Sequence, residues 1–201
     1  MITAQDKILY VASKLGLTSL KDMQASTGAV YDVDTDTSNV IFSNASQHQN
    51  PTVTNINQNQ FEVNEALLVE TIGFYVLVNG TVVRNFQRFF DSGTVIVYDL
   101  IIGNKTVMKN TPIFGAGSPY TFANVAQSAA AIGEDTAQAY LPRHQTFMEG
   151  AGILIPPQVS WSIEYRLFNG VTGAAIAPSE AVALGCYLYG TKVLLNFNTS
   201  I

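Results

Sequence analysis

Charged side chains are scarce in this chain of 201 residues, because Asp, Glu, Lys and Arg make up only 12% of it, about half the usual share. Hydrophobic residues make up 47%, which excludes a disordered chain and fits one globular domain. Uncharged polar residues, among them 15 Asn and 11 Gln, must therefore form much of the surface. Because charge is depleted at the centres of protein–protein contacts, the composition favours a protein that works in an assembled state.

Basic residues are few and dispersed. There are 10 Lys and Arg against 15 Asp and Glu, a formal net charge of −5, and no basic cluster is denser than Arg84 and Arg88. Proteins that bind nucleic acid need a basic patch to neutralise phosphates. We therefore expect no direct contact with nucleic acid.

Cysteine and histidine offer little chemistry. The single cysteine, Cys186, lies in an apolar run and has no partner for an intrachain disulfide, so we expect a small buried side chain. The two histidines, His48 and His144, lie far apart in polar surroundings. No serine stands in the Gly-x-Ser-x-Gly turn of a hydrolase. We predict that the chain is not an enzyme, with no catalytic residue, no cofactor and no small-molecule substrate.

Three aspartates alternate along one segment, at Asp32, Asp34 and Asp36. Such spacing suggests a calcium loop, but Thr37 and Ser43 stand where an EF-hand requires glycine and glutamate. In an extended strand the three side chains share one face. We therefore expect a solvated strand face and no metal site.

The N-terminal residues predict a short amphipathic helix. Thr3 and Asp6 form a capping-box pattern, the apolar residues that follow are spaced by three and four, and Gly16 ends the pattern. The apolar face has three interpretations: it packs on the chain's own sheet, docks on another subunit, or lies on a membrane surface. Because the first residues lack a basic region followed by an apolar region, and no apolar run is long enough to cross a bilayer, we expect neither a signal peptide nor a membrane span.

The remaining chain predicts an all-β fold. Residues 43–60 are almost wholly uncharged and polar, and we interpret 1–60 as a helix followed by a polar arm and 61–201 as a β-sandwich. Turns at Asn79-Gly80 and Gly103-Asn104 predict two hairpins, and an insertion with a short helix is expected at about 114–142. The predicted strands are 67–78, 81–90, 94–102, 106–113, 145–155, 158–168, 182–189 and 191–197. Eight antiparallel strands match a jelly roll.

One predicted strand shows which side is buried. From Val159 to Leu167 the odd positions are apolar and the even positions polar, so one face should be buried and the other wet. Trp161 lies on the apolar face, and we expect it in the core.

Taken together, the helical N-terminus, the polar arm 43–60, the β run FEVNEALLVETIGFYV at 61–76 and the segment LYGTKV at 188–193 resemble the jelly-roll capsid proteins of bacteriophages. The resemblance implies a structural virion protein that assembles in the host cytoplasm with copies of itself and other virion proteins into an icosahedral shell. The absent basic arm argues against genome contact and leaves a lining against lipid open. We expect subunit contacts at the parts that a sandwich least requires: Ile8, Val11 and Leu15 in the helix, and Tyr120 and Phe122 in the insertion.

A second interpretation stays open. The chain could be a carbohydrate- or receptor-binding β-sandwich of a phage tail or spike, with Trp161, Tyr120 or Tyr140 stacking on a sugar.

Overall fold

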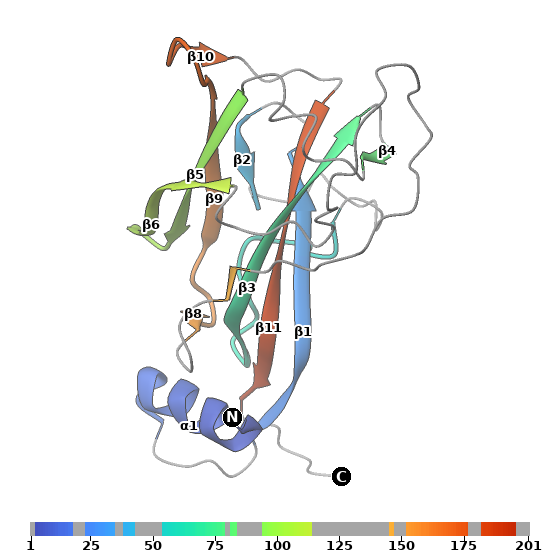
Figure 1. The fold of residues 1–201 in the computed structure, drawn as a ribbon. Helices are drawn as coiled ribbons and strands as arrows, with labels where there is room; N and C mark the ends of the chain where they lie inside the picture. The colour runs from blue at the N-terminus through green and yellow to red at the C-terminus, as the bar shows by residue number, and fades with distance from the viewer. Residues whose placement is uncertain are drawn as a thin grey trace.

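The structure is a computed structural model that describes residues 3–17, 23–34, 38–42, 54–78, 81–83, 94–113, 145–146, 152–176 and 182–195. In these parts of the chain two antiparallel sheets face each other, with a helix at one end (Figure 1). The all-β class expected from the sequence is confirmed.

Helix α1 (Ala4–Leu15) begins and ends as its sequence predicts. The Thr3 hydroxyl accepts a hydrogen bond from the Asp6 N–H at 3.2 Å, and the Asp6 carboxylate accepts one from the Thr3 N–H at 2.8 Å. This reciprocal pair satisfies two N–H groups that a helix start otherwise leaves free. Gly16 adopts φ 69°, the left-handed conformation that terminates many helices.

The first sheet is built around two long strands, β3 (Glu65–Val78) and β11 (Val182–Leu194). β1 (Gln24–Val33) pairs with the free side of β11 and forms one edge of the sheet. The other side of β3 pairs with three short strands, β4 (Thr81–Val83), β7 (Gln145–Thr146) and β8 (Ile153–Ile155).

The second sheet is centred on β9 (Trp161–Asn169) and β5 (Thr94–Ile102). β6 (Lys105–Pro112) pairs with β5 and forms one edge. Two short strands, β2 (Val40–Ile41) and β10 (Ala175–Ile176), pair with β9 on its other side.

The core lies between the two sheets, and the alternation predicted for β9 is confirmed. Trp161, Ile163 and Tyr165 are buried, whereas the intervening Glu164 and Arg166 are exposed. The Trp161 ring stacks on Phe61, with centroids 4.8 Å apart and planes 11° apart. Packing of this kind gives aromatic pairs an attraction of about 0.5–1.5 kcal/mol beyond the burial of their surface.

Both predicted two-residue hairpins are confirmed by strand register. Val78 pairs with Thr81 across Asn79-Gly80, and Ile102 pairs with Lys105 across Gly103-Asn104. Gly103 has φ 62°, a conformation that glycine adopts without steric cost.

The predicted set of eight strands needs correction. Strand β1 is not among the eight predicted strands, although the alternating aspartates predict an extended segment that overlaps its end. The predicted 182–189 and 191–197 are not two strands, because β11 runs continuously, and its pairing with β3 skips Glu70 between Tyr189 and Gly190. The predicted strand 145–155 contains two short strands, β7 and β8. Of 81–90, only residues 81–83 are described, and the predicted insertion at 114–142 lies outside the described residues.

The segment before residue 61 contributes to both sheets. β1 belongs to the first sheet and β2 to the second, whereas the sequence predicts a helix and an arm here, with an extended segment only at the alternating aspartates. Residues 43–53 of the expected arm lie outside the described part of the chain. Thr54 and Asn55 donate hydrogen bonds to Tyr31 of β1, and the Asn59 carbonyl accepts one from Trp161 of β9. Thr54 and Ile56 are buried.

Candidate assembly interface

β1 is the outermost strand of the first sheet (Figure 1). One side of it is hydrogen-bonded to β11 from Gln24 to Val33. The backbone groups on the other side of an edge strand are free to pair with another chain unless something covers them. The hydrogen bonds made by the backbone groups on this outer side of β1 therefore determine whether the edge can pair with another chain.

Asn55 covers the C-terminal half of that edge. The Tyr31 N–H donates to Asn55 Oδ1 at 2.8 Å, and the Tyr31 carbonyl accepts from the Asn55 backbone N–H at 3.2 Å. The Asn55 side-chain amide also donates to the Ala29 carbonyl at 2.8 Å. A single asparagine thus takes the place of a neighbouring strand at Tyr31 and at the Ala29 carbonyl.

The N-terminal half of the edge has no such cover. In an antiparallel strand both backbone groups of every second residue point to the same side, so Thr27 and Ala25 face outward as Tyr31 does. No hydrogen bond joins the outward groups of Ala25 and Thr27, or the Ala29 N–H, to any other described group. Ser26, Thr27 and Ala29 are exposed.

This open edge is also uncharged. From Met23 to Val30 the chain contains no Asp, Glu, Lys, Arg or Pro. These are the residues by which natural edge strands usually prevent pairing with other chains.

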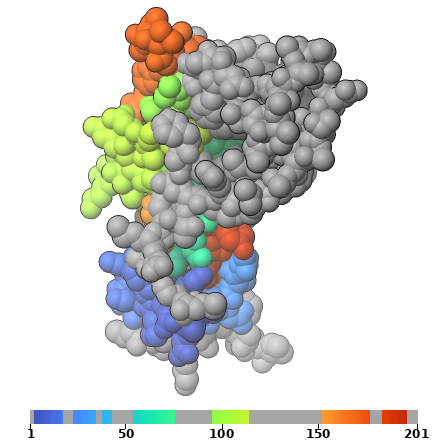
Figure 2. Space-filling model, in the orientation of Figure 1, coloured from blue at the N-terminus to red at the C-terminus, as the bar shows by residue number. Residues whose placement is uncertain are grey.

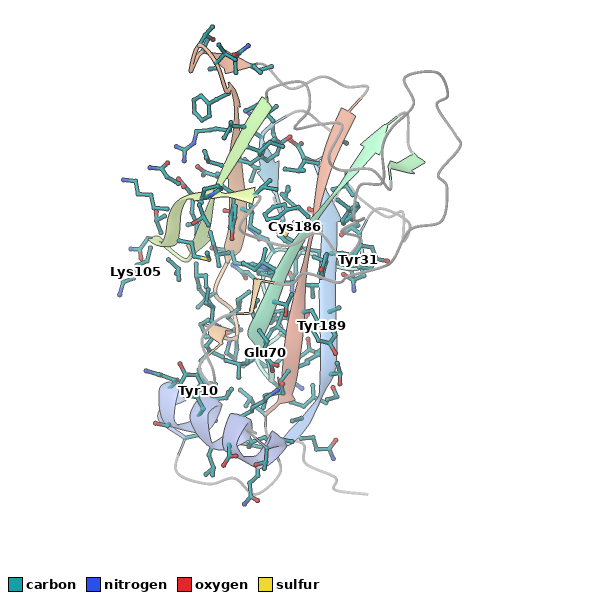
Figure 3. All side chains as sticks on the ribbon, in the orientation of Figure 1. Tyr10, Tyr31, Glu70, Lys105, Cys186 and Tyr189 are labelled. Atoms are coloured by element: carbon teal, nitrogen blue, oxygen red, sulfur yellow. The ribbon has the colours of Figure 1, made fainter. Side chains whose placement is uncertain are left out.

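The opposite edge of the fold carries the protection that β1 lacks. β6 contains Lys105, Lys109 and Pro112, and its pairing with β5 is interrupted by irregularities beside Asn110, whose φ is 50°. Figure 3 shows Lys105 pointing away from the sheets at the tip of the β5–β6 hairpin. Since β2, β4, β7, β8 and β10 are only two or three residues long, β1 is the one long unprotected edge among the described strands.

The helix packs on the chain's own sheet, which is the first of its three interpretations. Val11 is fully buried in a cluster with residues of β3 and β11 that include Leu68 and Val193. In the space-filling view α1 abuts β1 and β11 at one end of the molecule (Figure 2). Lys7 forms a 2.7 Å ion pair with Glu70, which also accepts a 2.6 Å hydrogen bond from Thr191.

These contacts limit what the expected interface residues can do. Because Val11 is fully buried within the chain, only Ile8 and Leu15 of the helix candidates keep surface for another subunit. Their role at a subunit interface stays a prediction. Tyr120 and Phe122 lie outside the described residues.

The prediction that the alternating aspartates form a solvated strand face is wrong for Asp32 and Asp34, the two that the structure describes. Asp32 and Asp34 are 1% and 3% exposed. Asp34 accepts hydrogen bonds from the Asn39 N–H at 2.8 Å and the Tyr165 hydroxyl at 2.7 Å, and Asp32 accepts one from the Phe42 N–H at 2.7 Å. These carboxylates bind the backbone on either side of β2, at Asn39 and Phe42. Among the described residues no group of three metal-binding side chains occurs.

Cys186 is fully buried, as the sequence predicts. Burial, and to a smaller extent the nearby Asp32 carboxylate, raise the pKa of its thiol well above the ordinary value. Figure 3 shows it between the two sheets. The thiol is therefore a core side chain in its protonated form.

A cleft of about 240 Å³ lies between residues 28–30 of β1 and the segment 55–62. Side-chain amides line much of it, from Asn57, Gln58 and Gln60, together with Glu65 and Lys192, which form a 3.0 Å ion pair. Such groups offer hydrogen bonds to a neutral polar ligand.

Comparison with known proteins gives no relative: no family model, curated protein or solved structure matches this chain significantly. No helix in the described residues is long and apolar enough to cross a membrane.

Proposed function

We propose that this chain is a structural virion protein, a coat subunit that assembles with copies of itself and with other virion proteins into a closed shell. A jelly roll is the arrangement that we propose for its two sheets. The observation that carries the proposal is the open edge of β1, which presents unpaired and uncharged backbone beside a fold whose other long edge is protected.

The scarcity of charge gives independent support. Only 12% of the residues are charged, and three of the described cations, Lys7, Arg166 and Lys192, are already paired with carboxylates. Such a surface meets a copy of itself with little electrostatic repulsion and little cost for removing ions from water. Closed symmetry then lets one small subunit enclose a large volume without any chemical reaction.

Negative-stain electron microscopy of the concentrated purified protein, and of particles from the source material, tests this function. We expect closed particles that contain the chain. A protein that forms only irregular aggregates, or remains a monomer at every concentration, would contradict the proposal.

Carbohydrate binding remains a second candidate, and the amide-lined cleft favours it. Trp161 cannot provide an open stacking platform, because it is only 1% exposed and its ring is stacked on Phe61. The other expected stacking residues, Tyr120 and Tyr140, lie outside the described residues. Calorimetric titration with neutral sugars tests this candidate: reproducible binding that a Gln60→Ala variant loses would support it, and no heat of binding would remove it.

A further inference from the structure

We propose that two copies of this chain pair antiparallel through residues 23–29 of β1, with Ser26 of one copy opposite Ser26 of the other on a two-fold axis. The inference rests on the proposed function, since it names the partner of the open edge and the register in which it binds. The occupant is a second copy of the same strand.

The register follows from which backbone groups are free. With Ser26 opposite Ser26, Ala25 of each copy lies opposite Thr27 of the other. Both residues point their backbone groups outward, so each such pair exchanges two hydrogen bonds. The Ala29 N–H then reaches the Met23 carbonyl of the second copy. Every free outward group from Ala25 to the Ala29 N–H obtains a partner.

Asn55 opposes registers that are shifted toward Tyr31. A shift that places Thr27 opposite Thr27 puts Met23 of one copy opposite Tyr31 of the other, where Asn55 already occupies both backbone groups. With Ser26 opposite Ser26, Met23 lies opposite Ala29 instead, and there only the carbonyl is bonded to Asn55. Polar, glycine-containing strands specify their register weakly by side chains alone. Here Asn55 limits the register on the side of Tyr31, and the number of free backbone groups that obtain a partner favours Ser26 opposite Ser26.

Charge selects β1 over β6 for self-pairing. In an antiparallel pair, like charges directly opposite each other are destabilising. Self-pairing of β6 about Val107 would place Lys105 opposite Lys109, twice per dimer. Self-pairing of β1 brings no two charges together, because residues 23–30 carry none. Adding a strand to a sheet edge is a common way for proteins to bind extended segments.

Cysteine cross-linking tests the register directly. Residues opposite each other in a pair without mutual hydrogen bonds have Cα atoms about 4.5 Å apart, within the roughly 4.4–6.8 Å of natural disulfides. Ser26 occupies that position. In the same register the two Thr27 residues are diagonal neighbours at about 7–8 Å, beyond the reach of a disulfide. Ser26→Cys and Thr27→Cys therefore form a matched pair at adjacent exposed positions.

Both variants are made in the full chain, oxidised under non-denaturing conditions and analysed on non-reducing gels. We expect Ser26→Cys to form a reducible covalent dimer at least about tenfold faster than Thr27→Cys. The wild type should form none, because its thiol, Cys186, is fully buried. Faster cross-linking of Thr27→Cys would overturn the register. Absence of cross-linking in both variants would overturn pairing through this edge.

Hydrogen exchange of the wild type gives a second test that depends on no variant. We expect the amides of Ala25 and Thr27 to exchange more slowly as protein concentration rises, while the Tyr31 amide, already bonded to Asn55, does not change. Unchanged exchange at Ala25 and Thr27 in a sample that light scattering shows to be oligomeric would overturn the inference and leave the proposed function standing. A sample that stays monomeric at every concentration would contradict both.

Discussion

The Tyr165 hydroxyl donates a 2.7 Å hydrogen bond to the Asp34 carboxylate, and this bond joins the two sheets. Tyr165 lies on β9, and Asp34 directly follows β1. The same carboxylate accepts hydrogen bonds from the backbone N–H groups of Ser38 and Asn39, so it also holds the two residues that precede β2. Both side chains are at least nine-tenths buried, which removes water as an alternative partner.

Removing this hydroxyl should weaken the fold. Tyr165→Phe takes a donor away from a buried carboxylate, which costs about 1–3 kcal/mol of the free energy of unfolding. Tyr189→Phe is the control, because Tyr189 is 44% exposed and its hydroxyl should contribute little. Chemical denaturation of both variants measures the difference, and equal stabilities would contradict the role assigned to Asp34.

Gly73 should not tolerate alanine. On β3 it lies opposite Tyr187 of β11, and a Cβ at this position would overlap the tyrosine ring. Overpacking of this kind costs about 1–3 kcal/mol. Gly173→Ala is the comparison: no atom lies within 4 Å of its added Cβ, and only its φ of 68° opposes the change. Thermal unfolding should show the larger loss for Gly73→Ala, and the reverse order would refute the packing argument.

Cys186 should react only when the protein unfolds. Burial raises the pKa of its thiol, so little reactive thiolate forms near neutral pH, and the side chain is out of reach of reagents. We expect an aromatic disulfide reagent to label the native protein at the rate of unfolding and to label it at once in guanidinium chloride. Fast labelling of the native protein would show that the core around Cys186 is open.

The start of α1 should weaken in acid. Hydrogen bonds from Thr3 hold the pKa of Asp6 below its usual value. A carboxylate whose pKa is lowered by folding stabilises the native state above the unfolded pKa of about 3.9, and that contribution disappears as pH falls through the folded pKa. Far-UV circular dichroism below about pH 4 should show less change in Asp6→Asn than in the wild type. Identical acid profiles would mean that the capping box contributes nothing.

Removing Asn55 should lengthen the open edge. Asn55→Ala removes the side chain that is bonded to the Tyr31 N–H and the Ala29 carbonyl, so the register with Thr27 opposite Thr27, which places Met23 opposite Tyr31, meets less competition for these groups. We expect Thr27→Cys to cross-link measurably faster in the Asn55→Ala background. An unchanged rate would show that Asn55 does not set the register.

Local turn and cap chemistry explains why part of the fold could be predicted. Thr3, Asp6 and Gly16 define α1, and Asn79-Gly80 defines the hairpin of β3 and β4, because each signal acts within a few residues of its effect. The alternation along β9 identified Trp161 as a core residue for the same reason.

The open edge of β1 could not be predicted, because it depends on contacts between distant parts of the chain. The first half of β1 lacks apolar alternation, since both of its faces are largely exposed, and Gly28 resembles a strand breaker. The nearest signal was the cluster of Val30, Tyr31 and Val33, residues that favour strands. Nothing distinguishes Asn55 from the other asparagines around it until the fold brings it beside Tyr31. Likewise, Gly190 resembles a turn residue but lies inside β11, where the pairing with β3 skips Glu70.

Light scattering of the wild type and Thr27→Pro over a range of concentrations tests the central claim most directly. Proline at residue 27 removes an outward N–H without removing any hydrogen bond to β11, and edge strands accept proline at such positions. We predict that the wild type associates reversibly and that Thr27→Pro keeps its melting temperature while its association weakens at least about tenfold, since each dimer loses two hydrogen bonds. Equal association of the two proteins, or a wild type that never associates, would contradict assembly through β1.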